Sequence, residues 1–550
     1  MPVSKSAPAL RAFAAGARLV GRHWAIVLYA GLSMGIASWV SWEAFRVQAV
    51  TFDARTDYWE HSATLHALIE NPWHPQNPHV VSAAGSPRFG PQFLLAALIA
   101  RAFHFDAMAA MSLVAACNAW LLVGSIGLFF TTYFRDERAA LYGIIEMFGS
   151  WWHAWHFSNV YQLSVFFSVA SYPSSTAIGL TLLGFWLAVH TLRTKRKPGV
   201  LLGLLVAWAL CVFVIHQLTA VMSLSGLGLL AVTEPAVPLR RRLEVIGTLI
   251  VGVGVAHFWP YFSPWQVLAG GHSSAQHWVQ DSVQQAVQLD VKTRLHLFYR
   301  QNGLLNSLGL ALVTIPALPY FLIRRERWFV ALGALSMLVP FAVNAYIELP
   351  LGHRFILLAI LYLQIGVVWL LLLLTPGSPQ ALPIFRYRAA QVAGASIVFA
   401  TLLIFGWHNL EAAQKELGKR RYLAGPPSPL VSDMREVARL AGPNAVLLAT
   451  APVSWPVPTF GPKVLVLLHE NPLIEDADER QAAVSRFFKQ STPNDERLEI
   501  LRRYHVSHVL LFRERDGGRA LGRFLAERAE VHGVGHGFRL YTLGPIAEKP

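Results

Sequence analysis

Charged residues are scarce in this chain of 550 residues. Asp, Glu, Lys and Arg make up 14% of it, whereas 54% is hydrophobic and the mean hydropathy is +0.41. Soluble domains carry about 25% charged residues, so most of this surface must face an apolar medium. The composition excludes an ordinary soluble protein and predicts a polytopic integral membrane protein, with the lipid bilayer as a partner.

Cysteine is almost absent, since Cys117 and Cys211 are the only two and both lie inside apolar runs. A disulfide framework and a cysteine-based metal site are therefore excluded. No other ligand cluster stands out, so we predict no cofactor, and a divalent cation has no support from the sequence. The net charge of +14 would suggest nucleic acid in a soluble protein, but the basic residues gather in short loops between apolar runs. We exclude nucleic acid as a partner.

Long apolar runs, in contrast, recur along the whole chain. The first begins near Trp24 after a basic start and lacks a convincing small-residue cleavage site, so we interpret it as a retained span and not as a signal peptide. Hydropathy predicts about 13 spans, with the topology of 135–172 left open. They lie near 24–45, 89–104, 108–133, 139–153, 157–172, 174–192, 200–217, 218–232, 245–262, 303–322, 328–346, 355–375 and 390–408.

Basic loops indicate the orientation of these spans. Four of them, at 193–197, 240–242, 324–327 and 386–388, fall on one side of the predicted membrane. Positive charge marks the cytoplasmic side, so we expect an inner-membrane protein with a cytoplasmic N-terminus. Loops 47–88 and 263–302, and everything after residue 409, then face the outside.

The first outer loop holds the acidic candidates. Residues 58–70 are expected to form a short helix with Asp57 at its cap, which would bring Asp57, Glu60 and His61 together at one end. A carboxylate held there can act as a general base. Alternatively, Asp57 merely caps the helix and Glu60 pairs with a loop arginine, and spacing alone favours this second interpretation.

Cationic candidates lie at the other outer segments. In the second loop, residues 275–287 have the pattern of an amphipathic helix, and Arg294 and Arg300 follow it. Arginines outside the membrane run against the positive-inside bias, so they bind a phosphate or contact lipid headgroups. Arg354 begins an apolar span and needs a partner, which is either a phosphate or Glu348. His216, at an outer turn, belongs to the same site or is a satisfied interfacial histidine.

A small soluble domain is predicted at 425–550, after a transmembrane domain at 1–410. Strands and helices alternate in it, which predicts an α/β layer structure. The expected strands are 445–448, 464–467, 506–511 and 538–541, and the expected helices are 476–489, 494–504 and 518–528. It carries no phosphate-binding glycine loop, zinc spacing or nucleophile elbow, so we expect it to pack over the outer loops. The fold class is therefore mainly α, a transmembrane helical bundle with a small α/β extracytoplasmic domain.

Together these features resemble the GT-C superfamily of membrane glycosyltransferases. The resemblance covers nearly the full chain and rests on short motifs. They are the acidic segment around Asp57, Arg88-Phe89-Gly90-Pro91, His216-Gln217-Leu218-Thr219, His353-Arg354-Phe355, the stretch Leu501 to Val509 and the closing Phe538-Arg539-Leu540-Tyr541.

The resemblance implies an inverting transfer of a hexose or pentose from a polyprenyl-phosphate carrier to a lipid, glycan or protein acceptor, on the extracytoplasmic face. An acidic residue would deprotonate the acceptor, and cations would hold the leaving phosphate. The acid is Asp57 or Asp53, with Glu60 as a further candidate. The phosphate-binding candidates are Arg354, His353, Arg88, Arg294 and Arg300, and the resemblance does not specify the sugar or the acceptor.

Two other classes of protein remain open at this point. A transporter or flippase of a lipid-linked or anionic substrate would also have many spans, but it should show inverted repeats and interrupted helices at mid-membrane depth. No such repeat is visible in the sequence. A non-catalytic membrane scaffold is the second alternative.

Overall fold

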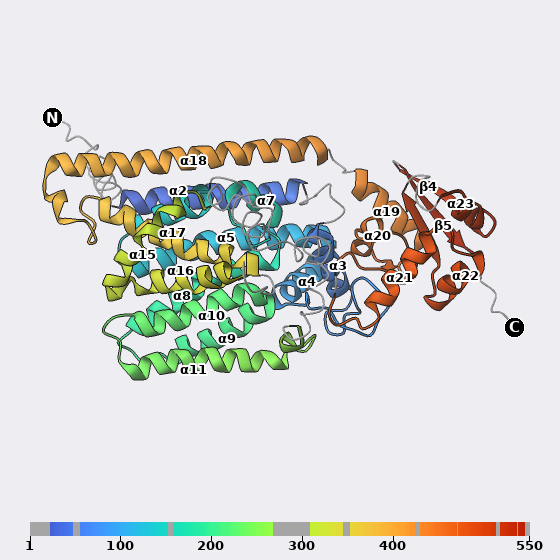
Figure 1. The fold of residues 1–550 in the computed structure, drawn as a ribbon, viewed down its shortest axis with the longest axis horizontal. Coiled ribbons are helices and arrows are strands. Elements are labelled where there is room, and N and C mark those ends of the chain that lie inside the picture. The colour runs from blue at the N-terminus through green and yellow to red at the C-terminus, as the bar shows by residue number, and fades with distance from the viewer. Residues whose placement is uncertain are drawn as a thin grey trace, which may run out of the picture.

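The computed structural model places a long helical bundle at one end of the molecule and a small α/β domain at the other (Figure 1). It describes residues 23–47, 56–151, 158–267, 308–344, 352–424, 429–469, 471–512, 518–535 and 537–544. The predicted amphipathic helix at 275–287 lies outside the described residues.

Six helices in the described part of the chain are long and apolar enough to cross a membrane. Five are α2 (Trp24–Val47), α5 (Ala107–Phe134), α8 (Pro173–Arg193), α17 (Phe355–Leu374) and α18 (Arg388–Ala424). The sixth, Arg325–Val343, consists of the short helix η4 (Arg325–Arg327) and α16 (Trp328–Val343). The apolar helix α17 runs through the middle of the bundle, and 94% of its most apolar 18-residue stretch is buried. Only 11% of the corresponding stretch of α18 is buried, and this helix lies along the outside (Figure 1). The chain is thus an integral membrane protein, as its composition predicts.

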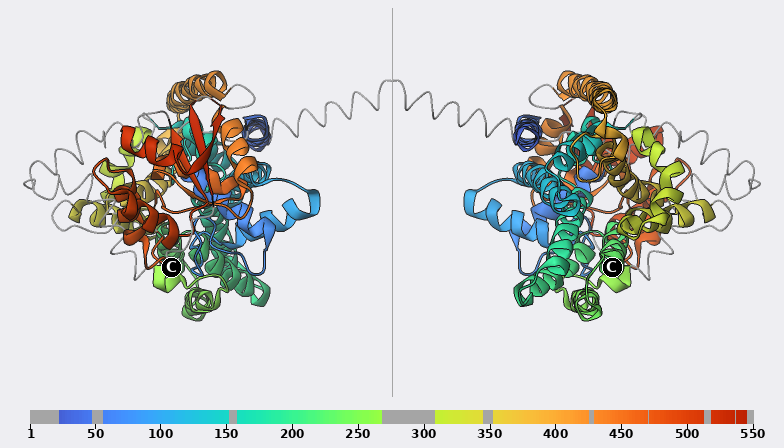
Figure 2. Two further views of the ribbon diagram at one scale, coloured as in Figure 1. Left: turned by 90° about the vertical axis from the view of Figure 1, so that its right-hand side faces the viewer. Right: turned by 90° about the vertical axis from the view of Figure 1, so that its left-hand side faces the viewer.

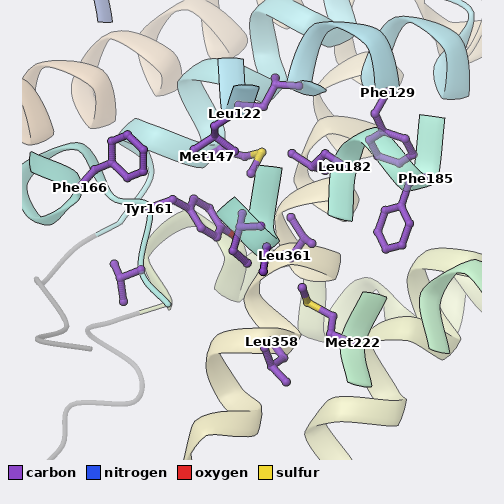
Figure 3. Close-up of a cluster of buried hydrophobic side chains, with 14 of the residues drawn as sticks. Leu122, Phe129, Met147, Tyr161, Phe166, Leu182, Phe185, Met222, Leu358 and Leu361 are labelled. Atoms are coloured by element: carbon purple, nitrogen blue, oxygen red, sulfur yellow. The ribbon is translucent and has the colours of Figure 1, made fainter. Parts of the chain in front are cut away.

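Shorter helices complete the bundle. They are α9 (Gly199–Ile215), α10 (Gln217–Thr233), α11 (Leu239–Val255) and α15 (Thr314–Ile323). Large side chains from α5, α8, α10 and α17 pack against one another in a buried cluster (Figure 3). Gly226 lets α10 approach that cluster closely, because a Cβ at this position would collide with the hydroxyl of Tyr362 and the ring of Phe185. The Tyr362 hydroxyl donates to the carbonyl of Met222 at 3.0 Å and satisfies its one polar atom inside the core.

Three predicted spans, near 89–104, 139–153 and 157–172, form helices too short to cross a bilayer. They are α4 (Pro91–Phe103), α6 (Arg138–Gly149) and α7 (Leu163–Val169), of 13, 12 and 7 residues. At 1.5 Å per residue they reach about 10–20 Å, less than the roughly 30 Å hydrocarbon layer. In the end-on views of Figure 2, α4 extends sideways from the bundle axis. Hydropathy detects burial but cannot tell burial by protein from burial by lipid, so the prediction of about 13 spans is not supported.

The four basic loops gather at the end of the bundle away from the α/β domain (Figure 1). There the Arg193 side chain donates to Glu234 at 2.6 Å and to the carbonyl of Thr132, which joins the ends of α8, α10 and α5. The hydroxyl of Tyr133 donates to the Glu326 carbonyl at 3.4 Å and adds the 324–327 loop. The predicted clustering of basic loops on one side is therefore present.

The α/β domain contains a five-stranded sheet of order β2-β1-β3-β5-β4. Strands β1 and β2 and strands β1 and β3 are parallel, whereas β5 is antiparallel to β3 and β4. The strands are β1 (Val446–Leu448), β2 (Lys463–Val464), β3 (His508–Phe512), β4 (Ala529–Val534) and β5 (Phe538–Leu543). The helices are α19 (Pro429–Ala441), α20 (Ala451–Ser454), α21 (Ala477–Phe488), α22 (Asn494–Arg503) and α23 (Gly518–Ala526).

The α/β architecture confirms the prediction for this domain, with differences in detail. Strand β2 is shorter than the predicted 464–467, and α19, α20 and β4 are not predicted. Strand β4 escapes detection because its residues Ala529, Glu530 and His532 leave it only partly buried at the sheet edge, so it lacks a clear apolar alternation.

Candidate active site

The loop at 47–88, predicted to be the first outer loop, contains helix α3 (Asp57–Glu70), close to the predicted 58–70. Its N-cap is Thr56 in an extended conformation, so Asp57 is the first helical residue and not the cap as predicted. Asp57 and Glu60 lie in the first turn, where negative charge interacts favourably with the helix dipole. Because Asp57, Glu60 and His61 are three and four residues apart, they share one face of the helix.

Glu60 is held by a loop arginine. Its carboxylate accepts from Arg88 Nε at 2.9 Å and from the Arg88 terminal nitrogen at 3.4 Å, and the Glu60 side chain is only 9% exposed. Burial alone would raise the pKa of Glu60, but the charge of Arg88 lowers it overall. The pairing of Glu60 with a loop arginine, one half of the predicted alternative, is therefore observed, whereas its other half, Asp57 as the helix cap, is wrong.

His61 is buried between aromatic rings. Its imidazole lies 4.9 Å from the ring of Tyr172 and 5.6 Å from that of Phe93, measured between centroids. Burial lowers the pKa of His61 to about 4, so the ring is neutral at physiological pH. A neutral, enclosed imidazole at this position contributes packing against the neighbouring rings and does not supply charge to the site.

The α/β domain is attached to this loop by hydrogen bonds. The indole N–H of Trp455 donates to the carbonyl of Thr56 at 3.1 Å, and the hydroxyls of Ser62 and Thr459 lie 2.6 Å apart. Both contacts bind α3 to the segment between β1 and β2. The predicted packing of this domain is therefore present for the loop at 47–88, whereas most of the second loop, 263–302, lies outside the described residues.

A second set of contacts binds the loop after α3. The backbone N–H of Val464 in β2 donates to the His79 carbonyl at 2.8 Å, and Lys463 Nζ donates to the Asn77 carbonyl at 2.9 Å. The His79 ring stacks on the indole of Trp455 with centroids 4.7 Å apart and planes at 13°. The loop thus pairs with the edge of the sheet at β2, and these hydrogen bonds and the ring stacking attach the domain to the loop.

Asp57 meets a histidine of the α/β domain. Nε2 of His469 lies 3.1 Å from Oδ1 of Asp57, with the histidine side chain 11% exposed and the aspartate 42% exposed. Burial favours the neutral acid, but the contact with His469 and the charges of His469 and Arg88 hold the pKa of Asp57 well below its usual range. Asp57 is consequently an ionised carboxylate that remains open to solvent on one side.

Cationic groups complete the cluster. Arg354 ends the short helix Gly352–Arg354 just before α17, and its charge interacts with those of Asp57 and Arg88. His216 lies between α9 and α10, where Nδ1 accepts from the Thr219 N–H at 3.2 Å. Burial and the charges of Arg88 and Arg354 lower the pKa of His216 to about 3. His216 is thus a neutral helix cap at the edge of the cluster.

The structure brings together six of the residues predicted from the sequence. They are Asp57, Glu60, His61, Arg88, His216 and Arg354. Asp53, Arg294, Arg300 and Glu348 lie outside the described residues, as does the side chain of His353. Those predictions remain predictions.

Sequence reasoning missed His469 and Trp455, which lie about 400 positions from Asp57. No local pattern marks either residue, and only the docking of the α/β domain brings them to α3. Among the residues that the structure describes, no group of three or more His, Cys, Asp or Glu side chains is placed to hold a metal ion.

A cavity of about 450 Å³ lies elsewhere on α3. It is lined by His66 and Ile69 of α3, Asp106, Arg435, Arg439 and Phe460, among others. His66 is nine residues after Asp57, which places it on the opposite side of the helix, since nine residues are two and a half turns. The cavity and the carboxylate of Asp57 are therefore separate features of the same helix.

Comparison with solved structures identifies the fold. The structure of ArnT from Cupriavidus metallidurans bound to undecaprenyl phosphate matches with a TM-score of 0.53 and 13% identity, over 96% of this chain and 99% of that one. The chain has the GT-C fold. The same ArnT in its apo state matches with a TM-score of 0.52, 13% identity and coverage of 96% and 100%. No family model and no curated protein matches the sequence.

The likeness to ArnT confirms the predicted fold resemblance over nearly the whole of both chains. At this low identity the likeness concerns the fold, and residue roles must come from this chain's own site. An arabinofuranosyltransferase, AftD from Mycobacteria, aligns with a TM-score of 0.49 and 13% identity, over 95% of this chain and 40% of that one.

Proposed function

We propose that this protein is a membrane glycosyltransferase that moves a sugar from a polyprenyl-phosphate carrier to an acceptor hydroxyl or amide, with inversion at the anomeric carbon. The observation that carries the proposal is the solvent-open, ionised carboxylate of Asp57, with Arg88 and Arg354 close enough for charge interaction. ArnT, whose fold this chain shares, has been solved with undecaprenyl phosphate.

In the proposed reaction Asp57 is the general base. It takes the proton from the acceptor as the acceptor attacks the anomeric carbon, and the bond from that carbon to the phosphate oxygen breaks. The electron pair of the broken bond stays on the polyprenyl phosphate, where negative charge increases. Arg354 is suited to stabilise this charge, because a guanidinium can make two parallel hydrogen bonds to a phosphate. Arg88 contributes positive charge, although Glu60 already occupies part of its donor set.

We propose that the reaction takes place on the extracytoplasmic side. Asp57 lies at the end of the bundle that carries the α/β domain, and the basic loops lie at the other end (Figure 1). The excess of Lys and Arg marks the cytoplasmic side, so the Asp57 end faces outward. A transporter would need its charged site near mid-membrane depth, so the position of this cluster favours the glycosyltransferase.

The test is transfer by the purified protein from a panel of polyprenyl-phosphate sugars. Asp57→Asn removes the basic oxygen and keeps the size of the side chain, and loss of a general base lowers the rate about 10²–10⁴-fold. Asp495→Asn is the matched control, because Asp495 is an exposed residue of α22 in the α/β domain. Normal turnover by Asp57→Asn would show that Asp57 is not the base.

A further inference from the structure

We propose that His469 of the α/β domain is a positioning residue that orients the Asp57 carboxylate, so that this domain completes the active site. The inference rests on the proposed function, because it assigns a partner to the proposed base. Its starting point is the ion pair of 3.1 Å between His469 Nε2 and Asp57 Oδ1. Since the contact is made to Oδ1, the other carboxylate oxygen can face the acceptor.

The histidine is itself held in place by its own domain. Its ring meets the indole of Trp455 edge to face, with centroids 5.1 Å apart and planes at 87°. Trp455 is 1% exposed and donates its indole N–H to the carbonyl of Thr56, the residue just before Asp57. The same indole therefore locates both the start of α3 and the imidazole that contacts Asp57.

This arrangement fixes the carboxylate from two sides. The Trp455 contact holds the backbone at the N-cap of α3, and the His469 contact holds the end of the side chain. An aspartate that is 42% exposed would otherwise sample several rotamers, each with its oxygens in a different direction. A general base must keep its oxygen within about 3 Å of the acceptor atom that carries the proton. Selecting one rotamer of Asp57 therefore raises the fraction of enzyme molecules that are ready to react.

Charged and titratable groups surround His469 on several elements. Asp57, Glu60 and His61 face it from α3, and His79 and Arg88 face it from the loop that follows. Burial opposes protonation of His469, but the contact with Asp57 and the charges of Glu60 and Asp57 outweigh burial and raise its pKa. The raised pKa favours the protonated imidazole, which suits a donor to a carboxylate.

The test compares His469→Ala and His469→Gln in the polyprenyl-phosphate-sugar transfer assay. Ala removes the contact, and Gln keeps an N–H donor of similar reach without the charge. We expect kcat to fall up to about 100-fold in His469→Ala and to be partly restored in His469→Gln, because misplacing a reacting group costs rates of this order. The donor KM should stay within about twofold, because His469 contacts the base and not the donor.

A pH profile separates positioning from a merely structural role. In His469→Gln the acid limb of kcat/KM should move to higher pH by about 1 unit or more, because a nearby cation lowers a carboxylate pKa by about 1–3 units. His532→Gln is the matched control, since His532 of β4 also lies near a carboxylate, that of Glu530, at 3.8 Å. The control should leave the profile unchanged.

The outcomes are distinct. Wild-type kcat and an unmoved acid limb in both His469 variants would overturn the inference. Equal losses of kcat in both variants with no shift of the limb would also overturn it, because they indicate only a packing role. If Asp57→Asn keeps its turnover, the proposed base is wrong whatever the His469 variants do. If Asp57→Asn is inactive while the His469 variants behave as wild type, only the positioning role fails.

Discussion

The stacked pair of His79 and Trp455 predicts that acid opens the joint between the α/β domain and the first outer loop. His79 is 4% exposed, and burial lowers its pKa to about 3 although the charge of Glu60 opposes this. When the joint opens, the imidazole regains water and its pKa returns to about 6.5. A histidine with a lowered folded pKa stabilises the joint above pH 6.5, and this stabilisation is lost progressively as the pH falls from about 6.5 toward 3.

The size of the effect follows from the two pKa values. Between pH 7 and pH 5 the open state gains protons at His79 and the closed state does not. The opening constant should therefore increase about 25-fold, which corresponds to about 2 kcal/mol. His469 has the opposite effect on the pH dependence of opening, because its pKa is raised in the closed state. Its contribution to the stability of the closed joint is lost as the pH rises through that raised pKa. The His79 effect must therefore be isolated by mutation.

His79→Phe isolates it, because a phenyl ring can still stack on Trp455 but cannot titrate. The backbone amide of Val464 reports on the opening directly, since it donates to the His79 carbonyl at 2.8 Å. Hydrogen exchange at this amide, corrected for the intrinsic rate at each pH, gives the opening constant. We expect the pH 5 to pH 7 ratio of opening constants to be about 25-fold larger in the wild type than in His79→Phe.

His74→Phe is the matched control, because His74 is an exposed histidine of the same loop. It should keep the wild-type ratio. Equal ratios in the wild type and His79→Phe would refute the reasoning, since the buried imidazole would then contribute nothing to the acid response.

Three further predictions concern the cluster and its orientation. Arg354→Ala should weaken donor binding about tenfold or more. Arg354→Lys should restore only part of the affinity, because lysine keeps the charge but cannot make the bidentate hydrogen bonds of a guanidinium. Unchanged donor affinity on folded protein would exclude this phosphate contact. Arg88→Gln should lower thermal stability more than the double variant Arg88→Gln/Glu60→Gln does, because the single change leaves a buried carboxylate unpaired at a cost of about 3 kcal/mol. Thermal unfolding in detergent measures the two losses of stability, and equal losses would contradict the prediction. Reporter fusions at positions 195, 241 and 325 should be cytoplasmic and one at 430 external, and a cytoplasmic reporter at 430 would reverse the proposed active face.

The sequence by itself determined the membrane class, the resemblance to the GT-C fold and the acidic helix of the first loop. Each depends on short-range information. A span is a continuous apolar run such as 355–375, and α3 carries Asp57, Glu60 and His61 on one face because helical geometry fixes the spacing. Predicting that the basic loops lie on one side needed only their charge and their position in the chain. These patterns persist whatever the tertiary contacts are.

Only the tertiary structure decided which residues meet Asp57 and which apolar runs form helices long enough to cross a membrane. His469 reaches Asp57 across about 400 positions because the α/β domain folds back onto α3, and no periodicity encodes that contact. The apolar runs at α4, α6 and α7 look like spans, but in the structure they are too short to cross. The physical reason is the same in both cases: hydrophobic burial has no direction, so a sequence shows that a residue is to be buried or paired, and only packing selects its partner.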